Sequence, residues 1–105
     1  MKKNNSVGEI LREYREEKGL LLRQVAALLD IDTAILSKIE RGERKAKKEQ
    51  IVQLAKILDL NQEDLIVQYL SEKILYEIQD EELAEKALKV AEQKIKYNND
   101  KKSKD

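Results

Sequence analysis

The sequence contains no cysteine, no histidine, no tryptophan and no proline. Without cysteine or histidine the chain has no thiol nucleophile, no disulfide, no Cys/His metal site and no histidine to act as a general acid or base. Only Asp, Glu and Lys remain as candidates for catalytic chemistry, and the sequence shows no converging set of them. We therefore expect a protein that is not an enzyme and that binds no metal and no cofactor.

The sequence also lacks a long uncharged apolar run, so it predicts no membrane-spanning helix. Its polar start, MKKNNS, is not followed by the apolar core of a signal peptide. We expect a cytoplasmic protein that does not contact a membrane.

The scarcity of helix-breaking residues indicates the fold class. Three glycines, no proline and 40% charged residues are typical of amphipathic helices with Lys, Arg and Glu on their exposed faces. A length of 105 residues allows one domain plus an extension, and only four aromatic residues mean that the core is aliphatic. The expected fold is all-α.

Apolar spacing predicts five helices in the first part of the chain. Apolar residues recur at i, i+3, i+4 and i+7 from Val7 to Tyr14, and Gly19 then suits a left-handed helix end. Asp32 and Asn61 are candidate N-caps of the third and fifth helices. The expected helices are Val7–Lys18, a two-turn helix around residues 25–29, residues 33–41 ending at Gly42, a helix through residues 51–58, and a fifth from Asn61 to about Glu77.

Only a few residues, around LLDID, join the second and third helices, which forces a sharp crossing between them. The stretch from Ile10 to Leu60, with its run LSKIERG and its spacing from Gly19 to Gly42, resembles the helix-turn-helix domain of the lambda-repressor-like (Cro/CI, XRE) family. It is also similar to the controller-type regulators encoded beside restriction-modification genes. The resemblance implies a five-helix DNA-binding domain with a C-terminal helical extension. The expected parts are a flexible N-terminus at residues 1–6, the DNA-binding domain at 7–68, the extension at 69–97 and a disordered tail at 98–105.

The outward face of the third helix is the candidate for reading base pairs. Leu36 and Ile39 are expected to face the core, and the resemblance implies that the opposite face enters the major groove. Lysine can donate to O6 and N7 of guanine, and the methyl groups of Thr and Ala suit the thymine methyl. The residues assigned to base recognition are Thr33, Ala34, Ser37 and Lys38, of which the serine can also donate to a phosphate.

A positive edge follows the third helix. Residues 38–48 carry six basic and two acidic side chains, whereas residues 59–92 carry three basic and ten acidic ones. The net charge of zero therefore includes one segment with net positive charge and one with net negative charge. By itself such a run is typical of a solvated surface, but within a helix-turn-helix domain it suits phosphate contact. Leu21 and Leu22 stand where the family often has a polar phosphate ligand, and Arg23 can substitute. Phosphate contacts are assigned to Arg23, Arg41, Arg44, Lys45 and Lys47.

The resemblance also implies an ion pair between Arg15 in the first helix and Glu40 at the end of the third. By the resemblance such a pair is partly buried and links these two helices, so its role would be structural.

The last part of the chain carries a heptad-like seam. Ala84, Leu88, Ala91 and Ile95 follow one another at 4-3-4 spacing with charged flanks. Two heptads are too short for a self-sufficient coiled coil, so the seam packs either on the fifth helix of its own chain or on a second subunit. We favour a homodimer, because helix-turn-helix proteins commonly bind two half-sites about one DNA turn apart. The residues assigned to dimerisation are Tyr69, Ile74, Tyr76, Leu88, Ala91 and Ile95. The two tyrosines could equally belong to the core of their own chain.

The sequence therefore predicts a sequence-specific, double-stranded-DNA-binding transcriptional regulator. It would act as a homodimer and control its own or a neighbouring operon by occupying an operator. Two alternatives stay open. One is an antitoxin-type regulator whose acidic C-terminal helices bind a partner protein, and the other is a protein-interaction adaptor that has lost DNA binding.

Overall fold

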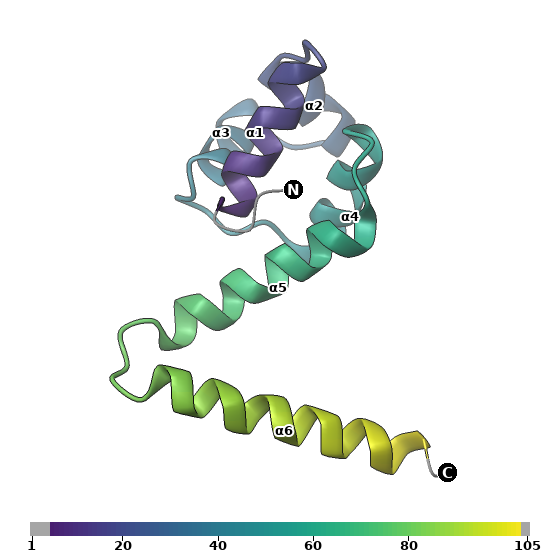
Figure 1. Cartoon of the computed structure of the whole chain (residues 1–105). Helices are drawn as coiled ribbons and strands as arrows, with labels where there is room; N and C mark the ends of the chain where they lie inside the picture. Colours follow the sequence, from purple (N-terminus) through teal and green to yellow (C-terminus); the bar gives the residue numbers. More distant parts are fainter. Residues whose placement is uncertain (1–4, 104–105) are drawn as a thin grey trace. The chain divides into compact units, whose positions relative to one another are not determined.

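The computed structural model describes residues 5–103, which form six α-helices and no strand (Figure 1). The all-α fold predicted from the sequence is confirmed. Residues 1–4, most of the expected flexible N-terminus, lie outside the described residues. In chain order the helices are α1 Val7–Glu17, α2 Leu22–Leu29, α3 Thr33–Glu40, α4 Lys48–Ile57, α5 Gln62–Ile78 and α6 Ala84–Ser103.

Two compact units divide the chain between Lys73 and Ile74. The first contains α1 to α4 and α5 up to Lys73, and the second contains the end of α5 and α6. Tyr69, the first residue of the expected extension, packs against the core of the first unit.

The first unit has the aliphatic core that the composition predicts. Leu11 of α1, Leu36 of α3, Ile51 of α4 and Leu65 of α5 each have 0% of their surface exposed. Burying one such side chain stabilises the fold by about 1.5–3 kcal/mol. Ile39 is also buried, so the predicted core face of the third helix is confirmed.

Helices α1 to α4 all end at a residue in the left-handed conformation. Gly19, Asp30, Gly42 and Asp59 have φ of 68°, 57°, 76° and 56°. In each case the N–H of the next residue donates to the carbonyl oxygen five residues earlier, at 2.8–3.0 Å. The helix ends predicted at the two glycines are confirmed, and aspartate is one of the residues that adopt this conformation most readily.

Polar side chains cap two of the helices. Ser6 Oγ accepts a hydrogen bond from the N–H of Glu9 at 3.2 Å, and Asn61 Oδ1 accepts one from the N–H of Asp64 at 2.9 Å. The predicted cap at Asn61 is therefore confirmed. Asp32 occupies the N-cap position of α3, but its side chain makes no capping hydrogen bond.

Two contacts fix α1 against α3 and α5. A Cβ atom added to Gly8 would lie 2.6 Å from the carbonyl oxygen of Ile39 and under 3.0 Å from that of Glu40, so only glycine allows the backbones of α1 and α3 to approach this closely. At the start of α1, the N–H of Val7 donates to Glu72 Oε1 of α5 at 2.7 Å. This bond satisfies one of the N–H groups that a helix start leaves without a partner.

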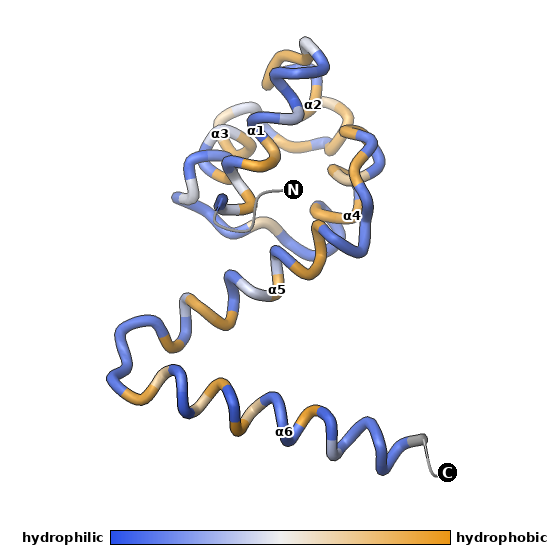
Figure 2. Tube along the Cα trace, viewed as in Figure 1, coloured by the Kyte–Doolittle hydropathy of each residue, from blue (hydrophilic) through white to orange (hydrophobic). Residues whose placement is uncertain are grey.

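Helix α6 is 20 residues long, and none of the side chains described between residues 84 and 102 is buried. Figure 2 shows hydrophobic and hydrophilic residues alternating along it. It continues through residues 98–103, which we expected to be disordered, and only 104–105 lie outside the described residues. Lys101 and Lys102 in the last turn favour this helix, because positive charge there interacts well with the helix dipole.

Candidate nucleic-acid interface

A tight turn sets the angle between α2 and α3. Helix α2 ends at Leu29, Asp30 takes the left-handed conformation, and the N–H of Ile31 donates to the carbonyl of Ala26 at 3.0 Å. The side chain of Ile31 packs against the core, and α3 begins two residues later at Thr33. Three residues therefore connect the two helices, which is the geometry of a helix-turn-helix motif.

Helix α3 separates its core side from its solvent side clearly. Leu36, Ile39 and Glu40 are buried, whereas Thr33 and Ala34 are exposed. Lys38 is also exposed, and Ser37 is partly buried. The four residues assigned to base recognition thus lie on one accessible side of α3. Ile35, also partly buried, packs against the core.

The segment between α3 and α4 carries most of the positive edge. Arg41, Arg44, Lys45 and Lys47 are all exposed, and so is Arg23 on α2. Arg41 Nε lies 2.7 Å from Glu43 Oε2, with both side chains 57% exposed. A pair so exposed is weak and can exchange its carboxylate for another anion.

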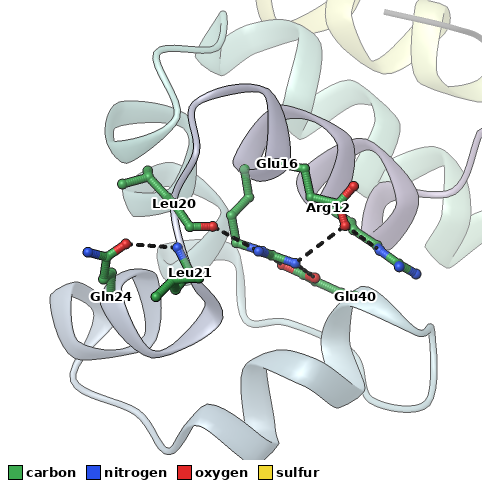
Figure 3. Close-up of polar contacts among 7 residues, drawn as sticks. Arg12, Glu16, Leu20, Leu21, Gln24 and Glu40 are labelled. Carbon is green, nitrogen blue, oxygen red and sulfur yellow. Dashed lines mark hydrogen bonds and ion pairs between the residues drawn. The ribbon is translucent and has the colours of Figure 1, made fainter.

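The predicted ion pair between Arg15 and Glu40 is present and holds α1 to the end of α3 (Figure 3). Arg15 Nε donates to Glu40 Oε2 at 2.8 Å, and Nη2 donates to Oε1 at 3.0 Å. Nη1 donates to the carbonyl of Leu20 at 2.9 Å, so the guanidinium also fixes the connection before α2. Both side chains are nearly buried, with 10% and 5% of their surface exposed.

This pair shifts the proton affinity of its cation. The hydrogen bond to Glu40 raises the pKa of Arg15 above its usual value, and burial acts in the opposite direction. Arg15 therefore stays charged and keeps its role as a fixed structural cation.

Two glutamines support the starts of α2 and α4 in the same way. The N–H of Leu21 donates to Gln24 Oε1, and the N–H of Lys47 donates to Gln50 Oε1, both at 2.8 Å. Neither N-cap side chain makes a capping hydrogen bond. The N–H groups in the first turn of α2 therefore have no side-chain cap, and the exposed Arg23 lies in the same turn.

The residues assigned to dimerisation do not lie in one environment. Tyr69 is partly buried against the core of the first unit, with Lys73 Nζ 5.4 Å from the centre of its ring. The other residues of this set are exposed, Ile74 by 46%, Tyr76 by 63%, Leu88 by 45% and Ile95 by 58%, as is Ala91. Tyr69 alone of these six residues is therefore partly buried.

Gly8 and Glu72 were not singled out from the sequence, although both position the helices of the first unit. Glycine and glutamate have no diagnostic spacing here, and their contacts join α1 to residues 31 and more positions away along the chain. Among residues 5–103, no cluster of three or more Asp and Glu side chains could hold a metal ion. No helix in this part of the chain is long and apolar enough to cross a membrane.

Comparison with known proteins identifies the motif. The family model of a helix-turn-helix domain matches residues 6–66, which is more than half of the chain and covers α1 to α4 and the start of α5. A comparison with curated proteins finds no match.

Proposed function

The chain belongs to the helix-turn-helix domain family, and from that premise we propose that it is a sequence-specific, double-stranded-DNA-binding transcriptional regulator. In this proposal it acts as a homodimer and represses or controls its own or a neighbouring operon. It works by occupying the operator, and its action requires no small-molecule ligand.

The accessible side of α3 is the observation that carries this proposal. Thr33, Ala34 and Lys38 are exposed on a helix whose other side is anchored by the buried Leu36 and Ile39. A rigid helix with small and basic side chains on its free side suits the major groove, which is wide enough to admit it. Lys38 would donate to guanine, and the methyl groups of Thr33 and Ala34 would contact thymine, with Ser37 beside them.

Phosphate contacts would fix the position of α3 in the groove. Arg44, Lys45 and Lys47 flank it on the chain after α3, with Arg41 available once it leaves Glu43, and Arg23 lies at the start of α2. Contacts of this kind set the register of the protein on DNA without reading its sequence.

Within the family, we propose the lambda-repressor-like (Cro/CI, XRE) subtype, with a controller-type regulator of a restriction-modification system as one form that it could take. The run LSKIERG and the ion pair of Arg15 with Glu40 support this subtype. The chain would act in the cytoplasm, with the DNA-binding domain at residues 7–68 and the dimerisation extension at 69–97.

An antitoxin-type regulator is the second candidate. The exposed apolar side chains of Leu75, Tyr76, Leu83 and Tyr97 favour a protein partner, because exposed apolar surface often marks an interaction site. A toxin that co-purifies with the chain would establish this candidate.

An adaptor that has lost DNA binding is the third candidate. An affinity for DNA that does not change with salt concentration would indicate it, because phosphate contacts make affinity depend on salt.

Two lysine variants test the proposed placement of α3. The binding site is first identified by selecting duplexes from a random pool with the wild-type chain. Affinities are then measured for a panel of duplexes that carry single-base changes in that site. Lys38→Ala should relax the preference at one base pair by about 1–3 kcal/mol, whereas Lys47→Ala should weaken all duplexes alike and lower the salt slope by about one unit. If both variants lost affinity uniformly, α3 would not read bases through Lys38.

A further inference from the structure

Asp32 carries a carboxylate that the fold does not use. It occupies the N-cap position of α3 and is exposed. Its backbone oxygen accepts from the N–H groups of Ile35 and Leu36 at 3.0 and 3.3 Å, so the main chain starts the helix in the usual way. Its side chain makes no capping hydrogen bond, and among residues 5–103 it has no other hydrogen-bond or ion-pair partner. The carboxylate is therefore available to a donor from outside the chain.

Two other N-cap side chains of the first unit behave differently. Ser6 Oγ accepts from the N–H of Glu9 at the start of α1, and Asn61 Oδ1 accepts from the N–H of Asp64 at the start of α5. Aspartate is as good an N-cap residue as serine or asparagine, so its type does not explain the missing bond at α3. The unused cap belongs to the helix that is proposed to enter the DNA groove.

The position of Asp32 on α3 suits contact with bases. In helix-turn-helix proteins the N-terminal residues of the second helix of the motif contact base edges. Asp32 directly precedes Thr33 and Ala34, which are exposed and assigned to base recognition. We propose that Asp32 recognises a cytosine in the major groove through its carboxylate. The inference rests on the proposed function, because it requires α3 in the groove, and it adds a base that none of the assigned residues selects.

Hydrogen-bond chemistry identifies cytosine as the base. An ionised carboxylate only accepts hydrogen bonds. On its major-groove edge guanine presents the acceptors N7 and O6, thymine presents the acceptor O4, and adenine presents the N7 acceptor beside its N6 donor. Cytosine presents the N4 donor and no acceptor. A carboxylate is therefore repelled by an acceptor on every other base and is matched by cytosine.

This cytosine is a separate requirement from the guanine assigned to Lys38. Asp32 and Lys38 lie near opposite ends of α3, six positions apart, which is about 9 Å along a helix axis. Successive bases of a DNA strand are only about 3.4 Å apart along the duplex. The two side chains therefore contact different base pairs, and the operator carries one more specified position than the four assigned residues provide.

The negative charge of Asp32 makes the contact selective. An acidic side chain beside DNA is repelled by the phosphates of every duplex. The hydrogen bond from cytosine N4 offsets this repulsion only where a cytosine occupies the contacted position. Asp32 therefore acts mainly by weakening binding to duplexes with another base at that position, which is a common source of specificity.

Asp32→Asn separates base recognition from helix capping. Asparagine is as good an N-cap residue as aspartate, so α3 should fold as before. Its amide, however, pairs with N6 and N7 of adenine. Affinities are measured for duplexes that carry each of the four base pairs at every position of the site selected by the wild type. The wild type should prefer cytosine at one position by about fivefold or more, and Asp32→Asn should prefer adenine at that position and keep the other preferences.

Asp32→Ala removes the carboxylate without supplying a new donor or acceptor. It should bind duplexes with any of the four bases at that position with nearly equal affinity, because neither the hydrogen bond nor the repulsion remains. A cytosine preference that survived in Asp32→Ala would belong to another residue and would overturn the inference. Circular dichroism of both variants checks that the helical content is unchanged.

Asp30→Asn is the matched control for charge. Asp30 is exposed two positions before Asp32, and asparagine readily adopts its left-handed conformation, with φ of 57°. The substitution removes one negative charge from the same turn. It should change the affinity for every duplex by the same factor and leave the preference for each base as in the wild type.

The outcomes separate this inference from the proposed function. If the wild type selects a site but Asp32→Asn only raises the affinity for all duplexes alike, as Asp30→Asn does, Asp32 merely repels phosphates. The inference is then wrong and the regulator stands. A wild type that selects no sequence contradicts the proposed function, and the inference fails with it.

Discussion

Arg15 and Glu40 join the first helix to the end of the third through two side-chain hydrogen bonds of 2.8 and 3.0 Å in a nearly solvent-free position. The guanidinium also donates to the carbonyl of Leu20 at 2.9 Å. One side chain thus ties together α1, the connection to α2 and α3. The accessible side of α3 depends on this attachment for its direction.

Removing one member of the pair should destabilise the protein strongly. Arg15→Met or Glu40→Leu leaves an unpaired buried charge, and we expect the free energy of unfolding to fall by about 3–5 kcal/mol. The double variant should recover most of the loss, because two apolar side chains leave no such charge. Urea unfolding measures all three.

The surface pair of Arg12 and Glu16 provides the control. Its atoms lie 2.9 Å apart, but the side chains are 62% and 55% exposed. Arg12→Ala should therefore change the free energy of unfolding by about 0.2–1 kcal/mol. An equal effect of Arg12→Ala and Arg15→Met would show that burial of the inner pair does not matter.

The contribution of the Arg15 cation should not change between neutral and moderately alkaline pH. The hydrogen bond to Glu40 raises the pKa of Arg15 above its usual value. A raised pKa of a cationic group adds stability that is fully present below the unfolded pKa and is lost only as pH rises through the folded one. The difference in unfolding free energy between wild type and Arg15→Met should therefore be the same at both pH values. A difference that shrank in this range would contradict the raised pKa.

Gly8→Ala should destabilise the protein, although alanine is the better helix former. Propensity alone favours alanine by about 1 kcal/mol in a helix. The added Cβ would instead meet the backbone oxygens of Ile39 and Glu40, which cannot turn away as a flexible side chain would. We expect a net loss of about 1–3 kcal/mol in thermal or urea unfolding. Gln53→Ala, at an exposed position of α4, is the matched control and should be nearly neutral. A stabilised Gly8→Ala variant would disprove the close approach of α1 and α3.

Glu72→Ala should loosen the start of α1. The carboxylate accepts from the N–H of Val7 at 2.7 Å, and removing a cap of this kind costs about 0.5–2 kcal/mol. Hydrogen exchange should show faster exchange of the Val7 amide and little change elsewhere in the helix. Glu77→Ala, on an exposed position of the same helix, should leave that amide unchanged.

Helix faces and helix ends could be predicted from this sequence because they depend on local spacing. The sequence correctly indicated the turn at Gly19, the cap at Asn61 and the buried side of α3 at Leu36 and Ile39. Local chemistry decides all of these within a few residues.

Apart from the ion pair of Arg15 with Glu40, which the family resemblance implied, features that depend on tertiary contact were not predicted. From the sequence alone Gly8 is only a residue of low helix propensity, and its close contact with α3 depends on the fold. Glu72 is one of many acidic residues, and its hydrogen bond to Val7, 65 positions earlier in the chain, forms only when α5 packs beside the start of α1. Asp32 was expected to cap α3 through its carboxylate, but its side chain makes no such bond. The type of a residue shows which contacts its side chain can make, but the packing of the helices determines which of them form.

The most direct test of the central claim is fluorescence-anisotropy binding to duplexes tiled across the DNA upstream of the gene for this chain, at several salt concentrations and against random duplex. We predict tight binding to one tile, with log affinity falling steeply against log salt as the basic side chains release counterions from phosphates. Binding to every tile no tighter than to random duplex, even at low salt, would contradict a sequence-specific regulator of its own gene.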